Sequence, residues 1–129
     1  MAVATGASGI NYRYGVSNFP EFFAKYITHA VCAWDDPEVE NRKPAPDCYH
    51  VAANRFASPP SDFSKVLIFE DSITGLKGAV ASGGRTVFVS KWKSMFVEEN
   101  QPYIRKAELV IDSMEDFKPE LFGLPPYEE

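Results

Sequence analysis

The stretch Lys65–Gly84, KVLIFEDSITGLKGAVASGG, decides the fold of this chain. Its apolar run Val66–Phe69 is too short for a helix and is bounded by charged residues, which is typical of a strand buried on both faces of a parallel sheet. The strand ends at Glu70 and Asp71, and the hydroxyl residue that follows can cap a helix over about 75–82. The stretch therefore predicts a strand, an acidic turn and a helix.

The acidic pair that follows this strand is a candidate site. Open α/β sheets bind their ligands at the carboxyl ends of their strands, which is where Glu70 and Asp71 stand. Because adjacent residues on a strand point to opposite faces, we expect one carboxylate to face a metal and the other to support it. A plainer interpretation also fits, since acidic side chains are common at helix N-termini.

The composition predicts one compact domain over residues 1–129, with 45% hydrophobic and 14% aromatic residues. A net charge of −5 argues against nucleic acid as an electrostatically attracted partner. The two cysteines, Cys32 and Cys48, are too few for a disulfide framework, and we expect them to be buried thiols. Nothing in the sequence approaches a membrane span or a signal peptide, so we expect no membrane partner and a cytoplasmic location.

Short β-rich runs alternate with helical patterns along the rest of the chain. Strands are predicted over Met1–Thr5, His29–Ala33, Arg85–Val89 and Glu108–Ile111, and helices over Asn18–Ile27, Asp47–Phe56 and Met95–Arg105, the last one broken near Pro102. This alternation predicts an α/β fold in which helices cover both faces of a parallel sheet. The tail from Asp112 has no periodic pattern, and we expect it to pack as coil.

Two further segments offer groups that suit a phosphate ligand. Thr5 and Gly6 begin a small-residue turn after the first strand, where backbone N–H groups can approach an anion and a hydroxyl can assist. Plain turn chemistry is the alternative. Lys43 begins the segment KPAPD, whose two prolines stiffen the chain and can aim the ammonium group at an anionic intermediate. An ordinary solvated loop lysine is the alternative there.

These residues resemble the motifs of a known superfamily. Thr5 at its strand end, Lys43 in KPAPD and the segment FEDSITG are similar, in order, to motifs two, three and four of the haloacid dehalogenase (HAD) superfamily. The segments HAVCAWDDPEVENRKPAPD and DFKPELFGLPPYEE resemble the C-terminal half of pseudouridine-5′-phosphatase-like HAD hydrolases. The resemblance covers nearly the whole chain and implies a Rossmann-like, three-layer fold.

The resemblance also implies a function. It implies a Mg²⁺-dependent phosphatase of small phosphorylated metabolites, in which an aspartate attacks phosphorus to form an aspartyl-phosphate. Thr5 matches the hydroxyl that holds a phosphate oxygen, with the backbone of Gly6 assisting. Lys43 matches the lysine that steadies the nucleophile and the transferring phosphoryl group. Asp71 matches the Mg²⁺-binding acid, and Glu70 its helper, in keeping with the preference of a hard cation for carboxylate oxygens.

The sequence departs from this pattern in its first motif. No Asp-x-Asp occurs in it, so the nucleophile, its strand and the cap that follows are missing, and Arg42 stands where the family usually has glycine. Without a nucleophile we expect the chain to be inactive by itself. The missing strand would lie between the Thr5 and Val66 strands, which must then pair with each other, pair with another chain or leave open edges.

Two functions therefore remain. One is the C-terminal part of a phosphatase whose nucleophile lies outside this chain. The other is a non-catalytic HAD-like domain that binds phosphate, a metal or a partner. Self-association through the unpaired edges is a further hypothesis.

Overall fold

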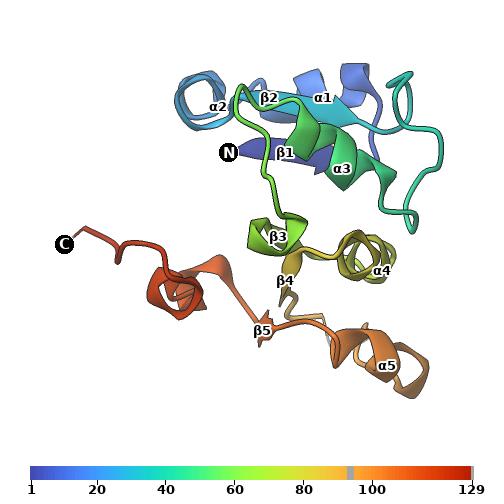
Figure 1. Ribbon diagram of the computed structural model, residues 1–129, viewed down its shortest axis with the longest axis vertical. Helices are drawn as coiled ribbons and strands as arrows, with labels where there is room; N and C mark the ends of the chain where they lie inside the picture. Colours follow the sequence, from blue (N-terminus) through green and yellow to red (C-terminus); the bar gives the residue numbers. More distant parts are fainter. Residues whose placement is uncertain (93–94, 129) are drawn as a thin grey trace.

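The computed structural model describes residues 1–92 and 95–128 (Figure 1). The strands are β1 Ala2–Thr5, β2 His29–Cys32, β3 Leu67–Glu70, β4 Arg85–Val89 and β5 Leu109–Ile111. The α-helices are α1 Gly9–Val16, α2 Pro20–Tyr26, α3 Asp47–Asn54, α4 Ile73–Ser82 and α5 Gln101–Ile104. Short 3₁₀ turns are present at Phe63–Lys65, Glu98–Asn100, Met114–Asp116 and Pro119–Phe122.

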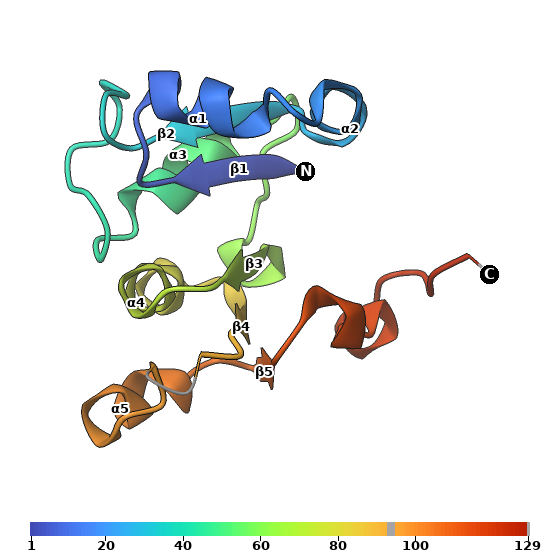
Figure 2. The same cartoon turned by 180° about the vertical axis from the view of Figure 1, so that it is seen from behind.

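The strands form two separate parallel sheets. β1 pairs with β2, and β3, β4 and β5 form a second sheet in that order. Figures 1 and 2 show the two sheets in different halves of the molecule, with α3 and α1 on opposite faces of the β1–β2 pair. The predicted α/β fold with parallel strands and helices on both faces is confirmed, and the sheet is divided between β1 and β3.

The edge of β1 that faces away from β2 has no strand partner among the described residues. The amide of Ala33 donates to the carbonyl of Thr5 at 2.8 Å, so Thr5 directs its backbone groups toward β2. Alternate residues of a parallel strand direct their backbone groups to the same side. Ala2 and Ala4 therefore present their N–H and C=O groups to the open edge.

The edge of β3 that faces away from β4 is open in the same way within the described residues. The amide of Arg85 donates to the carbonyl of Val66 at 2.8 Å, which assigns Val66 and every second residue after it to the β4 side. Leu67 and Phe69 then direct their backbone groups away from β4. The two strands therefore do not pair with each other, and both edges are open within the described residues of this chain.

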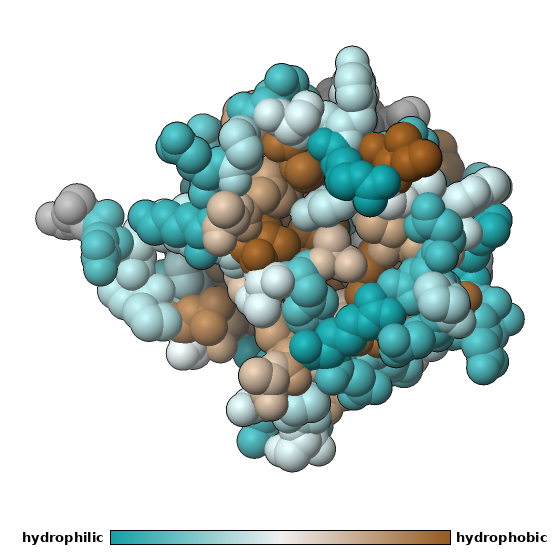
Figure 3. All heavy atoms as spheres, turned by 90° about the horizontal axis from the view of Figure 1, so that it is seen from above, coloured by the Kyte–Doolittle hydropathy of each residue, from teal (hydrophilic) through white to brown (hydrophobic). Residues whose placement is uncertain are grey.

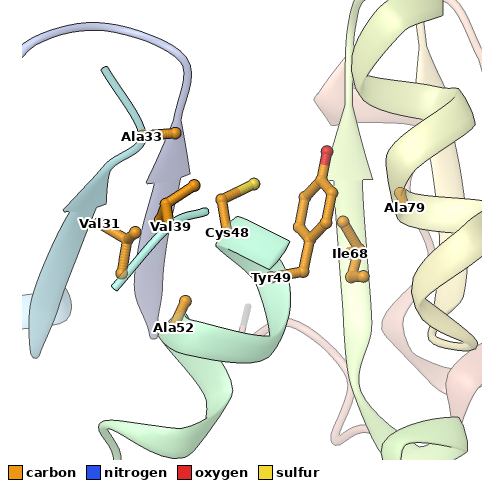
Figure 4. Close-up of a cluster of buried hydrophobic side chains, with 8 residues drawn as sticks. All are labelled: Val31, Ala33, Val39, Cys48, Tyr49, Ala52, Ile68 and Ala79. Atoms are coloured by element: carbon orange, nitrogen blue, oxygen red, sulfur yellow. The ribbon is translucent and has the colours of Figure 1, made fainter. Parts of the chain in front are cut away.

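Helix α3 joins the two halves through the main core. That core gathers side chains from β2 and the loop that follows it, and from α3, β3 and α4, namely Val31, Ala33, Val39, Cys48, Tyr49, Ala52, Ile68 and Ala79. Figure 4 shows α3 between the β1–β2 pair and β3, with Tyr49 on the side of β3. Cys32 and Cys48 are buried free thiols, as predicted.

A second core forms where α4 and α5 cover the other sheet. Leu76 and Phe88 are fully buried there beside Ile104. The tail packs on β3, with the ring of Phe117 edge-on to Phe69 at 4.9 Å between centroids. The tail predicted as coil thus contains two 3₁₀ turns and a buried aromatic residue. Of the helices in the described part of the chain, none has the length and apolar character that a bilayer crossing requires.

Helix α1 was not predicted from the sequence. It begins after Ser8, whose side chain accepts a hydrogen bond from the amide of Asn11, and none of its residues is buried. Figure 3 shows the end of the molecule that carries β1, β2, α1 and α2, where apolar patches lie exposed among polar residues. Its large apolar residues are exposed, Tyr14 by 83% and Ile10 by 70%. The helix therefore has no buried apolar face by which its sequence could have been recognised.

The predicted helix over Met95–Arg105 is much shorter in the structure. A 3₁₀ turn at Glu98–Asn100 leads directly into the four-residue helix α5. Pro102 lies in the first turn of α5, where its missing amide removes no helical hydrogen bond. Proline therefore starts the helix here instead of interrupting one.

An ion pair fixes the loop that runs from β2 to α3. At the end of α3, Arg55 donates two hydrogen bonds to the Asp36 carboxylate, at 2.6 and 2.8 Å, and one to Glu38 at 2.9 Å. The hydrogen bonds from Arg55 hold the pKa of Asp36 below its usual value. This contact pins the start of the loop that later carries Lys43.

We expect Asp36→Asn to lower the free energy of unfolding at pH 7 by about 1–3 kcal/mol, because the charge-assisted pair is lost. The folded-state pKa of Asp36 is depressed, so its stabilisation is complete above the unfolded pKa of about 4 and is lost as pH falls through the folded value. Urea unfolding at pH 7 and pH 3 should show the difference between variant and wild type shrinking at pH 3. A difference of equal size at both pH values would contradict this account. Glu108→Gln, which weakens an exposed pair with Arg85, is the control and should cost less.

Candidate functional site

The carboxyl ends of β1 and β3 open into one cavity of about 530 Å³. Its lining includes all five residues predicted from the sequence as site residues, namely Thr5, Gly6, Lys43, Glu70 and Asp71. These residues come from three segments that are far apart in the sequence. The structure therefore brings the predicted set together at the place where parallel strands end.

Lys43 bridges the two sheets at this cavity. Its Nζ lies 2.5 Å from Glu70 Oε1 on β3 and 3.1 Å from the carbonyl oxygen of Ala4 on β1. The side chains of Lys43 and Glu70 are only 14% and 7% exposed. A solvated loop lysine, the alternative interpretation of Lys43, is therefore wrong.

Tyr49 on α3 is the third member of this cluster. Its hydroxyl lies 2.6 Å from Glu70 Oε1 and 2.9 Å from the carbonyl oxygen of Gly75, and its one proton serves both acceptors. Burial, and then the neighbouring Glu70 charge, raise the pKa of Tyr49 well above its usual value. The phenol therefore remains a hydrogen-bond donor to Glu70 across the physiological pH range.

Two glycines of α4 allow this close packing. A Cβ atom at Gly75 would lie 1.8 Å from Glu70 Oε2, where no side chain fits. A Cβ atom at Gly78 would lie 3.0 Å from the carbonyl oxygen of Ala45, in the loop that follows Lys43. Helix α4 can thus approach both the buried carboxylate and the KPAPD loop because these positions lack side chains.

The turn after β1 presents the groups that suit a phosphate oxygen. The hydroxyl of Thr5 accepts a hydrogen bond from the amide of Ala7 at 3.2 Å, which leaves its own proton for another acceptor. A Cβ atom at Gly6 would meet no heavy atom within 4 Å. Packing therefore does not require glycine at position 6, and its part in binding stays a prediction.

Asp71 differs from Glu70 as the strand geometry predicts. Glu70 is buried and paired, whereas Asp71 is exposed, and no hydrogen bond or ion pair among the described residues engages its carboxylate. Ser72 follows and caps α4 by accepting a hydrogen bond from the amide of Gly75 at 3.0 Å. The two acids therefore have unequal surroundings.

The oxygen ligands at the cavity suit Mg²⁺ only in part. The described residues contain no group of three or more His, Cys, Asp or Glu side chains that could enclose a metal. Mg²⁺ commonly takes one or two protein carboxylates and completes its shell with water and phosphate oxygens. Asp71 fits as one such ligand, and Glu70 fits less well because Lys43 and Tyr49 occupy one of its oxygens. Both metal assignments stay predictions.

Known proteins resemble this chain in sequence and in fold. No family model matches it. It is 37% identical over its whole length to (DL)-glycerol-3-phosphatase 2 of Arabidopsis thaliana, and 38% identical over 98% of its length to a probable pseudouridine-5′-phosphatase of Drosophila melanogaster. A crystal structure of a conserved haloacid dehalogenase-like protein of unknown function from Agrobacterium tumefaciens shares its fold, with a TM-score of 0.70 and 23% identity over 89% of the chain.

The chain resembles HAD superfamily hydrolases in sequence and in fold. The two relatives align with the chain almost from end to end, and the solved structure has the same α/β fold. The chain spans about half of each of these three proteins, with 51% of both relatives and 50% of the solved chain covered. It resembles their C-terminal portion, as the sequence motifs indicated.

Three residues of this candidate site were not predicted from the sequence. Tyr49 lies within a predicted helix and was given no role. Its place in the first turn of that helix is the one sequence signal that could have suggested that it faces the sheet. Gly75 was taken as the start of a helix, which in fact begins two residues earlier. Trp34, which also lines the cavity, was given no role from the sequence.

Replacing Gly75 by alanine should displace the Glu70 carboxylate, because the new methyl group would occupy its place. We expect Gly75→Ala to lower the free energy of unfolding by about 1–3 kcal/mol, the usual cost of overpacking a core. Gly15→Ala is the matched control, since a Cβ atom there meets nothing within 4 Å and alanine favours a helix. Chemical denaturation measures both. Equal effects of the two variants would contradict the steric account of Gly75.

Proposed function

We propose that this chain is the C-terminal part of a HAD-type phosphatase that hydrolyses small phosphorylated metabolites with Mg²⁺ through an aspartyl-phosphate intermediate. The nucleophilic aspartate would lie outside these 129 residues. The proposal rests on one observation above all, which is the meeting of Thr5, Lys43 and Asp71 in a single cavity at the carboxyl ends of β1 and β3. The names of the relatives agree with this reaction class.

A slot between β1 and β3 supports a nucleophile carried on a separate strand. A cavity of about 490 Å³ lies there, and its lining is mostly apolar and includes Ala2, Ala4, Leu67 and Phe69. These are the residues whose backbone groups face the two open edges. An extended segment parallel to both strands could pair with β1 on one side and β3 on the other. Its carboxyl end would then reach the cavity that holds Lys43.

Each residue would have a distinct task in the reaction. The hydroxyl of Thr5 and the amide of Gly6 would donate hydrogen bonds to phosphate oxygens. The ammonium of Lys43, held in place by Glu70, would stabilise negative charge on the nucleophile and on the transferring group. Asp71 would hold Mg²⁺, which when bound offsets the charge of the phosphoryl group.

A non-catalytic binding domain is the second candidate. The two open strand edges favour it, because unpaired edges recruit further strands. In this form the chain would bind phosphate, a metal or a partner, and a second copy of the chain would supply strands to the open edges. If the chain is such a binding domain, we expect it to self-associate in solution.

Mg²⁺-dependent hydrolysis of p-nitrophenyl phosphate should separate the two candidates. We expect no turnover by the 129-residue chain and turnover by a protein extended upstream to include a DxDx(T/S) strand. Asp71→Ala should abolish that turnover and Lys43→Ala should lower it by at least about 100-fold, a loss typical of removing one charge-stabilising group. Glu21→Ala, on the exposed helix α2, should leave it unchanged.

Two results would count against the phosphatase. Turnover by the 129-residue chain alone would mean that another residue supplies the nucleophile. Absence of turnover in the extended protein, together with dimers of the chain in analytical ultracentrifugation, would favour the binding domain.

A further inference from the structure

We propose that Arg42, held against Trp34 at the rim of the cavity, is a specificity-determining residue that binds a second oxyanion on the leaving group of the substrate. This inference rests on the proposed phosphatase function and names a substrate class for it. The preferred substrates would be phosphomonoesters that carry a carboxylate or another phosphate beyond the phosphate to be cleaved.

The position of the guanidinium group is fixed by two contacts with one residue. Its central carbon lies 3.9 Å from the centroid of the Trp34 ring, and Nη2 donates a hydrogen bond to the Trp34 carbonyl oxygen at 3.3 Å. Neither contact neutralises its charge. A guanidinium has five N–H donors in a planar fork, so most of them stay free for a ligand.

The charges around the cavity also single out Arg42. Four charged side chains line it, those of Arg42, Lys43, Glu70 and Asp71. Lys43 is paired with Glu70, and Asp71 is reserved for the metal under the proposed function. Within the described residues no carboxylate pairs with Arg42. Among the residues that the structure describes, the cavity thus presents one cation without an acidic partner, Arg42.

Depth within the cavity separates the roles of the two cations. The side chain of Lys43 is buried between the sheets, whereas Arg42 and Trp34 are exposed, Trp34 by 59%. A phosphoryl group bound at Thr5 and Lys43 would direct its leaving group outward, toward the rim. Arginine suits an oxyanion at that place because its fork matches the two oxygens of a carboxylate or phosphate.

An arginine that merely stabilises the protein surface would make the same contact with a tryptophan. The chain offers a comparison, because Lys25 lies 4.9 Å above the Tyr26 ring on α2, outside the lining of this cavity. If Arg42 binds ligand, its removal must change the choice between ligands, which removal of Lys25 cannot do.

The test is calorimetric titration of the 129-residue chain with two matched pairs of ligands. Glycerol 3-phosphate and 3-phosphoglycerate differ by a carboxylate, and fructose 6-phosphate and fructose 1,6-bisphosphate differ by a phosphate. We expect the ligand with the second anion to bind about 10- to 100-fold more tightly in at least one pair, as for a charge-assisted hydrogen bond. The pair that shows the difference identifies the oxyanion.

Variants then assign the preference to Arg42. Arg42→Ala should remove the preference and leave the affinity for the ligand with one anion within about twofold, while Lys25→Ala should keep it. Arg42→Lys should retain part of it, because the charge remains and the fork is lost. Trp34→Leu should reduce it without removing the arginine. Circular dichroism confirms that each variant is folded.

The outcomes separate this inference from the function on which it rests. Equal affinities within both pairs, or an Arg42→Ala variant that weakens all four ligands alike, would overturn the role of Arg42 and leave the phosphate site standing. If the wild-type chain binds neither these ligands nor inorganic phosphate, the proposed phosphate site fails, and the role of Arg42 fails with it.

Discussion

The contact of Lys43 with Glu70 and Ala4 is the interaction on which the rest of this structure depends. It links the β1 side to the β3 side at the cavity, and both charged side chains are largely removed from water. A buried ion pair is stabilising only when further hydrogen bonds satisfy its members, and removal of one partner typically costs about 3–5 kcal/mol. Tyr49 supplies such a bond to Glu70.

The sequence around this pair is shaped to accommodate it. Gly75 leaves room for the carboxylate, Gly78 lets the KPAPD loop approach α4, and the Arg55 pair with Asp36 anchors the start of that loop. Each of these features positions Lys43 at the end of β1. In the proposed phosphatase, Lys43 between the two strand ends and the exposed carboxylate of Asp71 beside it would form half of a phosphoryl-transfer site. The apolar slot below it is the place where the other half would lie.

Much of this arrangement could be predicted from the sequence. The strands were predicted because their apolar runs are short and bounded by polar residues. Thr5, Lys43 and Asp71 were predicted as site residues because the segments that carry them follow predicted strands and resemble HAD motifs. Helix α1 was missed because none of its residues is buried, so its sequence lacks the regular spacing of apolar residues that identifies a helix. Tyr49 and Gly75 were missed because their importance arises from contacts across the fold, between α3, β3 and α4, and no local pattern encodes such contacts.

The central claim is that one further parallel strand pairs with the open edges of both β1 and β3. Hydrogen–deuterium exchange of the backbone amides of Ala2, Ala4, Leu67 and Phe69 tests it most directly, with Val87 in the middle strand β4 as the internal reference. We predict rapid exchange of these four amides in the 129-residue chain and strong protection in a protein extended upstream by the missing strand, while Val87 is protected in both. Equal protection of the four amides in the two proteins would contradict the account.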